Sequence, residues 1–284
     1  MSEISNLSVI HPAAVIAADV KIGPFCVIGP EVSLGPGCVL MNHVTLDGRA
    51  RIGPHNIFYP NTVVGVAGQD LKYRGGPTET IIGAGNTFRE AVTVHRGTEL
   101  GCGQTVIGDH NLFMVAAHIA HDCIIGSHNI ISNQTQLAGH VTIEDGAVLS
   151  ALIGVHHFVT IGRFSYVGAM TPVRRDVPPF MKYEGDPNEV RGVNKEGLKR
   201  TGFTDEEIEQ IERAYKALYR GEKDILSNLE QLESANGLNS HVKYLCQFVR
   251  SSCAGRFGRY RELLRRDQAA DRQRNPEQSE GGRA

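Results

Sequence analysis

The segment HIAHDC, residues 118–123, has the highest density of side chains that could take part in catalysis. His118 and His121 are three residues apart, and Asp122 directly follows His121. An imidazole can remove a proton from an attacking hydroxyl near neutral pH, and a neighbouring carboxylate can orient that imidazole and stabilise its charged form. The pair His121 and Asp122 is therefore a candidate general base with its partner. Histidines without a catalytic role, on a solvated corner, would give the same sequence pattern.

Further histidines follow at separations that suit adjacent coils of one repetitive structure. His95 lies in VHRGT, His140 in LAGH, and His156 and His157 in GVHHF. Several histidines on one strip favour a functional site over a solvated surface. Because histidine clusters also bind zinc, a metal site is the competing interpretation.

The elements that must position these side chains follow from a period of six residues. Large apolar side chains recur at every sixth position from Ile16 to Val64, return in phase at Ile82, slip by one residue between Leu100 and Ile107, and continue to Val173. A period of six fits neither an α-helix nor a plain alternating strand. It predicts short strands joined by corners, three to a triangular coil, with coils stacked at about 4.8 Å.

Two further rows support this interpretation. Small or β-branched residues stand four places after each large apolar one, as an inward row in a narrow core requires; examples are Val20, Cys26, Val32, Cys38 and Val44. The residue directly after the large one is often Gly, which we interpret as a position whose backbone conformation a Cβ would penalise.

The repeat is interrupted twice. Residues 66–80 are polar and rich in Gly, so we expect an external loop there, and its QDLKY motif offers Asp70 and Lys72 to a sugar and a phosphate. A smaller bulge or loop is expected around GCGQ, residues 101–104. The repetitive domain should cover residues 1–178.

The chain changes character after residue 178. Over 179–264 we expect a linker and a helical region, which includes a helix in TDEEIEQIERAYKALYR that begins with Thr204 as its N-cap and Glu207 as the capping-box partner. Two more helices are expected near 223–234 and 240–251. The charged tail at 265–284 has few large apolar residues and should be disordered.

Composition excludes several functional classes. The 284 residues have a formal charge of −2, which gives no reason to expect a nucleic acid partner. No apolar run approaches the roughly 20 residues of a membrane span, and the N-terminus does not resemble a signal peptide. Six scattered cysteines without a Cys-x-x-Cys pair favour reduced thiols and a cytoplasmic location.

Seven longer motifs allow a more specific prediction of fold and function. HPAAVI, GQDLKY, TVHRGT, NLFMVAAHIAHDC, LAGHV, DVPP and GVNKEGLKRTGF occur in this order. Over residues 10 to 220 they resemble the bacterial UDP-N-acetylglucosamine acyltransferase family, and the hexads over 10–178 resemble hexapeptide-repeat acyltransferases. The resemblance implies an all-β left-handed parallel β-helix followed by a C-terminal α-helical region. It also implies a cytoplasmic homotrimer with active sites between subunits.

The activity that the resemblance implies is the first step of lipid A biosynthesis. A 3-hydroxyacyl group would move from acyl carrier protein to the 3-hydroxyl of UDP-N-acetylglucosamine, with no cofactor and no metal. His121 would be the general base, Asp122 its partner, and the N–H of Gly139 an oxyanion donor. The implied substrate-binding residues are Gln69, Asp70, Lys72, His95, His118, His140, His156, His157, Asn194, Glu196 and Arg200.

Some positions depart from the family pattern. His157 stands where a Gln is usual, and Thr201 replaces the second of two arginines, so one cation for a phosphate is lost. Ala169 stands in the acyl-chain groove where some members have Gly, and we expect the larger side chain to shorten the acyl chain accepted.

Three alternatives remain open at this level. The same scaffold and base could acylate the amine of a 3-amino sugar nucleotide, or serve as the later N-acyltransferase of the pathway. The histidines could instead form a zinc site like that of γ-type carbonic anhydrases. A catalytically inactive scaffold is the third, but the intact HIAHDC segment argues against it.

Overall fold

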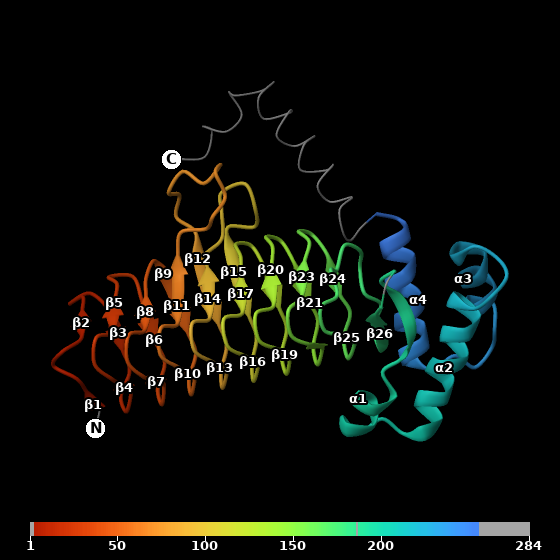
Figure 1. Ribbon diagram of the computed structural model, residues 1–284, viewed down its shortest axis with the longest axis horizontal. Helices are drawn as coiled ribbons and strands as arrows, with labels where there is room; N and C mark the ends of the chain where they lie inside the picture. Colours follow the sequence, from red (N-terminus) through yellow and green to blue (C-terminus); the bar gives the residue numbers. More distant parts are fainter. Residues whose placement is uncertain (1–2, 186, 256–284) are drawn as a thin grey trace, which may run out of the picture.

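Short strands joined by sharp corners wind through most of the chain and form a triangular prism. The computed structural model describes residues 3–185 and 187–255. Figure 1 shows the prism along the longest axis of the molecule, with a group of helices at its C-terminal end. The prism is a left-handed parallel β-helix, so the predicted fold class is confirmed. The tail predicted at 265–284 lies outside the described residues.

Each face of the prism is one sheet. Sheet A contains β1 (Glu3–Ile4), β4 (Lys21–Ile22), β7 (Val39–Leu40), β10 (Ile57–Phe58), β13 (Thr87–Phe88), β16 (Leu112–Phe113), β19 (Ile130–Ile131), β22 (Val148–Leu149), β25 (Tyr166–Val167), β26 (Met181–Glu184) and β27 (Glu189–Val193). Sheet B contains β2 (Val9–Ile10), β5 (Val27–Ile28), β8 (Thr45–Leu46), β11 (Val63–Val66), β14 (Thr93–His95), β17 (His118–Ile119), β20 (Gln136–Leu137) and β23 (Gly154–Val155). Sheet C contains β3 (Val15–Ile16), β6 (Ser33–Leu34), β9 (Arg49–Ile52), β12 (Glu79–Ile82), β15 (Gln104–Ile107), β18 (Ile124–Ile125), β21 (Thr142–Ile143) and β24 (Thr160–Ile161).

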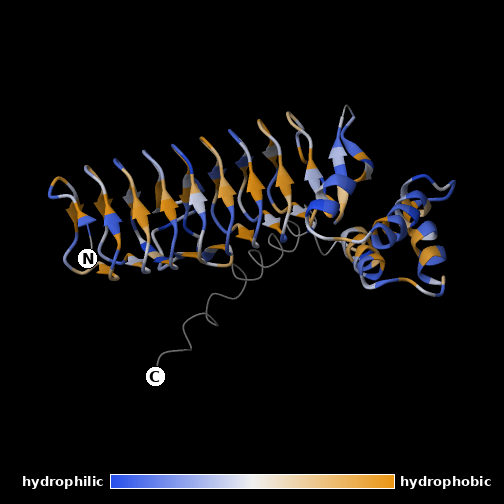
Figure 2. Ribbon diagram, turned by 90° about the horizontal axis from the view of Figure 1, so that it is seen from below, coloured by the Kyte–Doolittle hydropathy of each residue, from blue (hydrophilic) through white to orange (hydrophobic). Residues whose placement is uncertain are grey.

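The core is built from columns of like residues, because each coil places equivalent positions directly over one another. Phe58, Phe88 and Phe113 stack with 4.9 Å between successive ring centroids, and all three are fully buried. Beside them, Asn86 Nδ2 donates to Asn56 Oδ1 at 3.0 Å, and Asn111 Nδ2 donates to Asn86 Oδ1 at 2.9 Å. Figure 2 shows hydrophobic residues on the strands along the whole prism.

The glycines that directly follow the large apolar residues are needed for a different reason from the one predicted from the repeat. Gly53, which follows a strand, is not among the residues with positive φ, so the predicted need for an unusual backbone conformation is wrong there. A Cβ on Gly53 would instead lie 2.6 Å from the carbonyl oxygen of Gly83 in the next coil. Residues with a Cβ occupy most of the positive-φ corners, for example His55 at 57° and Asp122 at 59°.

Four helices cover the C-terminal end of the prism within the described residues: α1 (Lys195–Arg200), α2 (Asp205–Tyr219), α3 (Ile225–Glu233) and α4 (Ser240–Cys253). Thr204 is the N-cap of α2 and forms the predicted capping box with Glu207. Helix α4 is tied to the prism by hydrogen bonds from Tyr244 to Glu144 and from Ser252 to Asp176. None of these helices has the length and apolar content that a membrane crossing requires.

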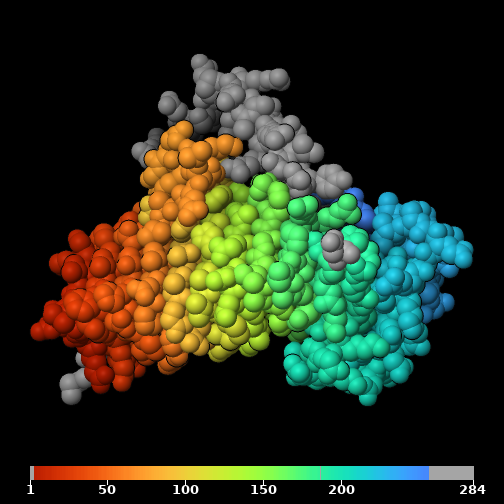
Figure 3. All heavy atoms as spheres, viewed as in Figure 1, coloured from red at the N-terminus to blue at the C-terminus, as the bar shows by residue number. Residues whose placement is uncertain are grey.

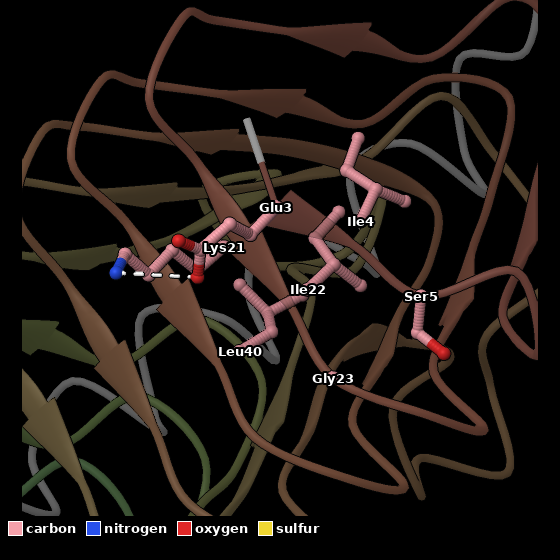
Figure 4. A pocket seen from close by; sticks show the side chains of 7 residues that line it. All are labelled: Glu3, Ile4, Ser5, Lys21, Ile22, Gly23 and Leu40. Atoms are coloured by element: carbon pink, nitrogen blue, oxygen red, sulfur yellow. Dashed lines mark ion pairs between the residues drawn. The ribbon is translucent and has the colours of Figure 1, made fainter. Parts of the chain in front are cut away.

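Among the described residues, no helix covers the opposite end of the prism. Figure 4 shows Ile4, Ile22 and Leu40, from the first strands of sheet A, with the ion pair between Lys21 and Glu3 beside them. This pocket at β1 is formed by the first coils, and its residues are distant in the sequence from the histidine-rich segment at 118–123.

Two loops leave the prism between sheets B and C. Residues 67–78 connect β11 to β12, and residues 96–103 connect β14 to β15. In Figure 1 they stand above the prism, and Figure 3 shows the first as a protrusion in orange on the surface. Both loops occur at the corner that also contains Asp122, His140 and Phe158, which follow strands of sheet B and precede strands of sheet C. We call this the B–C corner.

Candidate active site

The side chains of His121 and Asp122 meet at the B–C corner. His121 Nδ1 lies 2.8 Å from Asp122 Oδ2. Neighbouring side chains point to opposite faces of an extended strand, but Asp122 has a φ of 59° and turns its side chain back onto His121. A left-handed conformation at a non-glycine residue is tolerated here because the stacked coils fix every corner.

Asp122 is fully engaged by hydrogen-bond donors. Thr98 Oγ1 donates to Oδ2 at 2.6 Å, and the N–H groups of Thr98 and Gly103 donate to Oδ1 at 3.1 Å each. Its own N–H donates to Thr105 Oγ1 at 2.9 Å. Burial would raise the pKa of Asp122, but the hydrogen bonds from His121 and Thr98 outweigh it, so the pKa is held below its usual value. The carboxylate is therefore ionised, and His121 carries its proton on Nδ1.

Two further imidazoles lie on sheet B next to this pair. His118 Nδ1 is 2.7 Å from Thr93 Oγ1, and its ring meets the ring of His95 edge-on at 4.7 Å. Burial, followed by the charges of His95 and His121, lowers the pKa of His118 to about 4. Burial also lowers the pKa of His95. Both rings are neutral near pH 7, and among the described residues His95 Nδ1 has no hydrogen-bond partner.

An aromatic row continues the site along the B–C corner. The His140 ring meets the His121 ring edge-on at 5.1 Å and stacks on Phe158 at 4.5 Å. His157 contacts the other edge of this row, with its ring 5.5 Å from Phe158 and 3.8 Å from His156. The structure thus brings all six predicted histidines into one continuous cluster.

Two glycines lie against His121 and leave room for its ring. A Cβ on Gly139 would lie 2.6 Å from His121 Nε2, and one on Gly68 would lie 3.1 Å from His121 Cβ. Within the described part of the chain, the N–H of Gly139 donates to no other group. This N–H, on a residue that lies against the ring of the candidate base, is therefore available to an external acceptor.

The predicted sugar-binding residues lie on the loop that starts at Gly68. Gln69 and Lys72 are exposed, and Asp70 Oδ1 accepts a hydrogen bond from the N–H of Lys72 at 2.9 Å. Because Gly68 contacts His121, these residues project from a point next to the candidate base. The side chains of Gln69 and Lys72 face solvent in the single chain, whereas Asp70 is half-buried.

The two loops hold one another in place. The Glu99 carboxylate accepts hydrogen bonds from the N–H groups of Gly76 and Arg74. Arg96 Nε donates to the hydroxyl of Tyr73 at 2.9 Å. The loop that surrounds Asp122 is thus joined to the loop that bears Asp70 and Lys72.

The remaining predicted residues lie elsewhere in the chain. Asn194 is the N-cap of α1 and is buried, and its Nδ2 donates to the carbonyl oxygen of Phe164 at 3.0 Å. Glu196 and Arg200 are exposed on α1 and share a pocket with Lys182 and Tyr166 of sheet A. Ala169 is exposed at a corner between sheets A and B. The single chain does not unite these positions with the histidine cluster.

A metal site was the competing interpretation of the histidines. Ligand atoms of His121, Asp122 and His140 lie within 4.8 Å of one another, the only such group of three among the described residues. However, the oxygens of Asp122 already accept from Thr98, Gly103 and His121. A metal ion would have to displace these donors, so the donor set fits a hydrogen-bonded base better than a cation.

Three residues around Asp122 were missed by sequence reasoning. Thr98, Gly103 and Cys102 surround the carboxylate, with the thiol of Cys102 3.6 Å from Oδ1. The one-residue slip in the hexads near Gly103 was the available signal, because it showed that the chain leaves the regular coil there. Nothing in the spacing indicated that this loop folds onto a residue 24 positions away.

Taken together, the cluster contains one imidazole whose Nδ1 is fixed on a carboxylate and whose ring lies against Gly139, a residue whose backbone N–H donates to no other group in the described part of the chain. This arrangement can deprotonate an attacking hydroxyl or amine and stabilise the oxyanion that forms when it adds to a carbonyl group. The neutral imidazoles of His95 and His118 can donate or accept hydrogen bonds to a polar substrate without adding charge.

Comparison with protein families identifies two matching segments. Residues 13–48 match the bacterial transferase hexapeptide (six repeats) family, and residues 176–257 match domain 2 of the UDP N-acetylglucosamine O-acyltransferase family. The acyl-[acyl-carrier-protein]--UDP-N-acetylglucosamine O-acyltransferase of Stutzerimonas stutzeri is 43% identical over 255 residues, which is 90% of this chain and 99% of that protein. The protein of the same name from Pseudomonas fluorescens is 44% identical with the same coverage.

Solved structures of UDP-N-acetylglucosamine acyltransferases are also similar to this chain. The UDP-N-acetylglucosamine acyltransferase from Bacteroides fragilis superposes with a TM-score of 0.85 at 35% identity and covers 88% of this chain and 97% of its own. The Francisella novicida UDP-N-acetylglucosamine acyltransferase gives 0.83 at 37% identity, with 86% and 90% covered.

Proposed function

The chain belongs to the acyl-[acyl-carrier-protein]--UDP-N-acetylglucosamine O-acyltransferase family, and from this premise we propose that its reaction takes place at the His121–Asp122 pair. The protein transfers an acyl group from acyl carrier protein to an oxygen of UDP-N-acetylglucosamine, the first step of lipid A biosynthesis. The observation that carries the proposal is the 2.8 Å contact of His121 Nδ1 with a buried, ionised carboxylate, which leaves Nε2 free to act as a base.

The proposed reaction is a nucleophilic acyl substitution. His121 Nε2 removes the proton of the sugar 3-hydroxyl while its oxygen attacks the thioester carbon of a 3-hydroxyacyl carrier protein. The tetrahedral oxyanion accepts a hydrogen bond from the N–H of Gly139. The C–S bond then breaks, the proton on His121 passes to the sulfur, and an ester and a free thiol result. Asp122 keeps its charge throughout and stabilises the imidazolium.

The residues around the pair are proposed to bind the acceptor and the donor. His118 and His140 flank the base and would orient the sugar, together with Asp70 and Lys72. His95 offers an unpaired buried nitrogen for the donor or a phosphate. His156, His157 and Gln69 are proposed to contact the same ligands from the two ends of the cluster. Ala169 is proposed to line the acyl-chain groove.

A homotrimer is proposed because the site is incomplete in one chain. Asn194, the N-cap of α1, and Glu196 and Arg200 of α1 adjoin sheet A, whereas the histidines occupy sheet B and the B–C corner. A neighbouring copy that covers the histidine face would supply these groups for the nucleotide end of the substrate and turn an open face into a cleft. Exposed Leu71, at the tip of the first loop, would then be covered.

We further propose a cytoplasmic location, where acyl carrier protein and the sugar nucleotide are both present. The absence of a membrane-crossing helix among the described residues is compatible with it. No cofactor is required for the proposed steps, because the thioester supplies the driving force and the base is a side chain.

Acyl transfer by the purified protein tests the proposal. UDP-N-acetylglucosamine is incubated with a series of 3-hydroxyacyl carrier proteins, and products are identified by mass spectrometry while released thiol is counted. An alkali-labile ester with one thiol released per product is expected. Transfer only to a 3-amino sugar nucleotide, with an alkali-stable amide, would show that the acceptor atom is nitrogen. No product with either acceptor would refute the proposed reaction.

A further inference from the structure

The loop of residues 96–103 is shaped around the carboxylate of Asp122. A Cβ on Gly101 would lie 2.2 Å from the Asp122 carboxylate, so only glycine fits there. The N–H groups of Thr98 and Gly103, at the two ends of this turn, both donate to Oδ1 at 3.1 Å. The loop therefore wraps an anion that belongs to a different coil, instead of binding an external ligand.

The hydroxyl of Thr98 makes the shortest contact in this arrangement. Thr98 Oγ1 donates to Asp122 Oδ2 at 2.6 Å, and the same oxygen accepts from His121 Nδ1 at 2.8 Å. Two donors thus share one carboxylate oxygen. Thr98 is 1% exposed, so water cannot take the place of its hydroxyl. The strength of the bond to His121 must depend on how much of the oxygen's charge the Thr98 hydroxyl already neutralises.

Thr98 also stands between the base and the substrate loop. The next residue, Glu99, accepts hydrogen bonds from the N–H groups of Gly76 and Arg74. A displacement of the loop that bears Asp70 and Lys72 would therefore be transmitted to Asp122 in part through Glu99 and Thr98. The position of Thr98 couples the loop with the proposed sugar-binding residues to the carboxylate that orients the base.

We propose that Thr98 is a positioning residue for the acyl transfer, which holds the Asp122 carboxylate in place and limits how strongly it binds the proton on His121. This inference rests on the proposed function of His121 as general base. Thr98 does not touch the reacting atoms and acts through Asp122. The hexad pattern predicts no role for Thr98, because this residue lies in a loop outside the regular coil.

The direction of the effect follows from the charges that face Asp122. The titratable groups around it are His121 and Cys123 on its own segment, His140 on the next coil, and the thiol of Cys102 on the loop. None of these is negative near pH 7, so hydrogen bonds are what moderates the carboxylate. Without the Thr98 hydroxyl, Asp122 should hold the protonated form of His121 more tightly, and His121 should lose its proton at higher pH.

The test compares Thr98→Val, Thr98→Ser and the control Thr62→Val. Valine keeps the volume of Thr98 but removes the hydroxyl, and serine restores it. Thr62 is another fully buried threonine of the prism, and its hydroxyl donates to the carbonyl oxygen of Tyr59 at 2.8 Å, so Thr62→Val controls for the loss of a buried hydroxyl elsewhere. Circular dichroism and thermal melts establish that each full-length variant is folded.

Two readouts are taken on each protein. The first is kcat/KM for acyl transfer as a function of pH. The second is the pH titration of the His121 Cε1–H signal in ¹³C-histidine-labelled protein, assigned by its absence in His121→Ala. Thr98→Val should lower kcat/KM roughly 10- to 100-fold near pH 7 and move both the acid limb and the His121 titration upward by about half a unit or more. Thr98→Ser should remain within about 3-fold of wild type.

The outcomes are distinguishable. An unshifted His121 titration in Thr98→Val would overturn the inference, whether or not the rate falls, because a purely structural role predicts a loss of rate alone. An equal shift in Thr62→Val would overturn it too. If the wild-type protein does not transfer acyl groups at all, the proposed function fails, whereas the titration still decides whether Thr98 controls the His121–Asp122 pair.

Discussion

His121 Nδ1 and Asp122 Oδ2 are 2.8 Å apart although the two residues are consecutive in the chain. Consecutive side chains usually diverge in extended structure, and the contact exists because Asp122 adopts a φ of 59° at a corner of the prism. A dyad of adjacent residues needs no second segment to align it. The corner that turns the chain also assembles the base, so the scaffold and the proposed catalytic pair have the same structural origin.

Replacement of Asp122 by Asn removes the negative charge beside His121 but keeps nearly the same side-chain shape. The carboxamide has one acceptor oxygen for donors from Thr98, Gly103 and His121, so the proton of His121 is no longer fixed on Nδ1. A loss of roughly 10²–10⁴-fold in kcat is expected, together with a shift of the acid limb of the pH–rate profile to lower pH, since a negative neighbour is removed. Asp145→Asn is the control, because exposed Asp145 also accepts a backbone N–H, from Ser127 at 2.7 Å. Equal losses in both variants would contradict the assignment.

A methyl group on Gly139 should disable the base without unfolding the protein. The added Cβ would lie 2.6 Å from His121 Nε2 and push the ring off its position. We expect Gly139→Ala to lower kcat/KM roughly 100-fold, with a melting temperature near that of wild type. Gly154→Ala, at a site with nothing within 4 Å of the new Cβ, should keep full activity. Normal activity in Gly139→Ala would mean that His121 need not occupy the observed position.

The buried imidazoles predict a dependence of stability on pH. The pKa of His118 falls from an ordinary 6.5 to about 4 on folding, so between these values the unfolded chain binds a proton that the folded chain does not. The free energy of unfolding should therefore decrease as the pH falls from 6.5 to 4, by at most about 1.4 kcal/mol per pH unit from this residue. Urea unfolding at several pH values measures the slope. It should be shallower in His118→Asn than in the exposed-site control His128→Asn, and identical slopes would argue against a buried neutral His118.

Acyl-chain length provides a test of the exposed corner at Ala169. If Ala169 lines the groove, Ala169→Gly should accept donors that are longer by one or two carbons, because space opens at the end of the chain. Competition between 3-hydroxyacyl carrier proteins of different length, with products separated by mass, gives the preference directly. An unchanged product distribution would remove Ala169 from the groove. The exposed Leu152→Ala variant, at an equivalent corner, is the matched comparison.

Much of the fold could be predicted because a period of six depends on the coil itself and not on distant contacts. Residues such as Phe58 and Ile131 occupy the inward positions that their phase assigns, and both are fully buried. The capping box at Thr204 was equally local and is present. The glycine row was located correctly but explained wrongly, since close contact between coils, as at Gly53, depends on the stacking distance and not on the local backbone.

The site was only partly accessible from sequence, for a related reason. The histidines that share the periodic coil, His118, His121 and His140, could be placed together by counting. Thr98 could not, because its loop leaves the coil and returns onto Asp122 from outside the repeat. The six-residue helix α1 was also not anticipated, since so short a segment has no periodic apolar face.

The central claim is that one histidine of the cluster is the base. The direct measurement is kcat/KM of His121→Ala for acyl transfer to UDP-N-acetylglucosamine, beside His128→Ala. His128 also sits at a positive-φ corner and stacks on a neighbouring histidine, His110, at 5.2 Å, but it lies outside the B–C corner. A loss of roughly 10²–10⁴-fold is predicted for His121→Ala, with wild-type activity in His128→Ala. Activity of His121→Ala within a few fold of wild type would contradict the account, because the account places the base at the imidazole whose Nδ1 lies 2.8 Å from the Asp122 carboxylate.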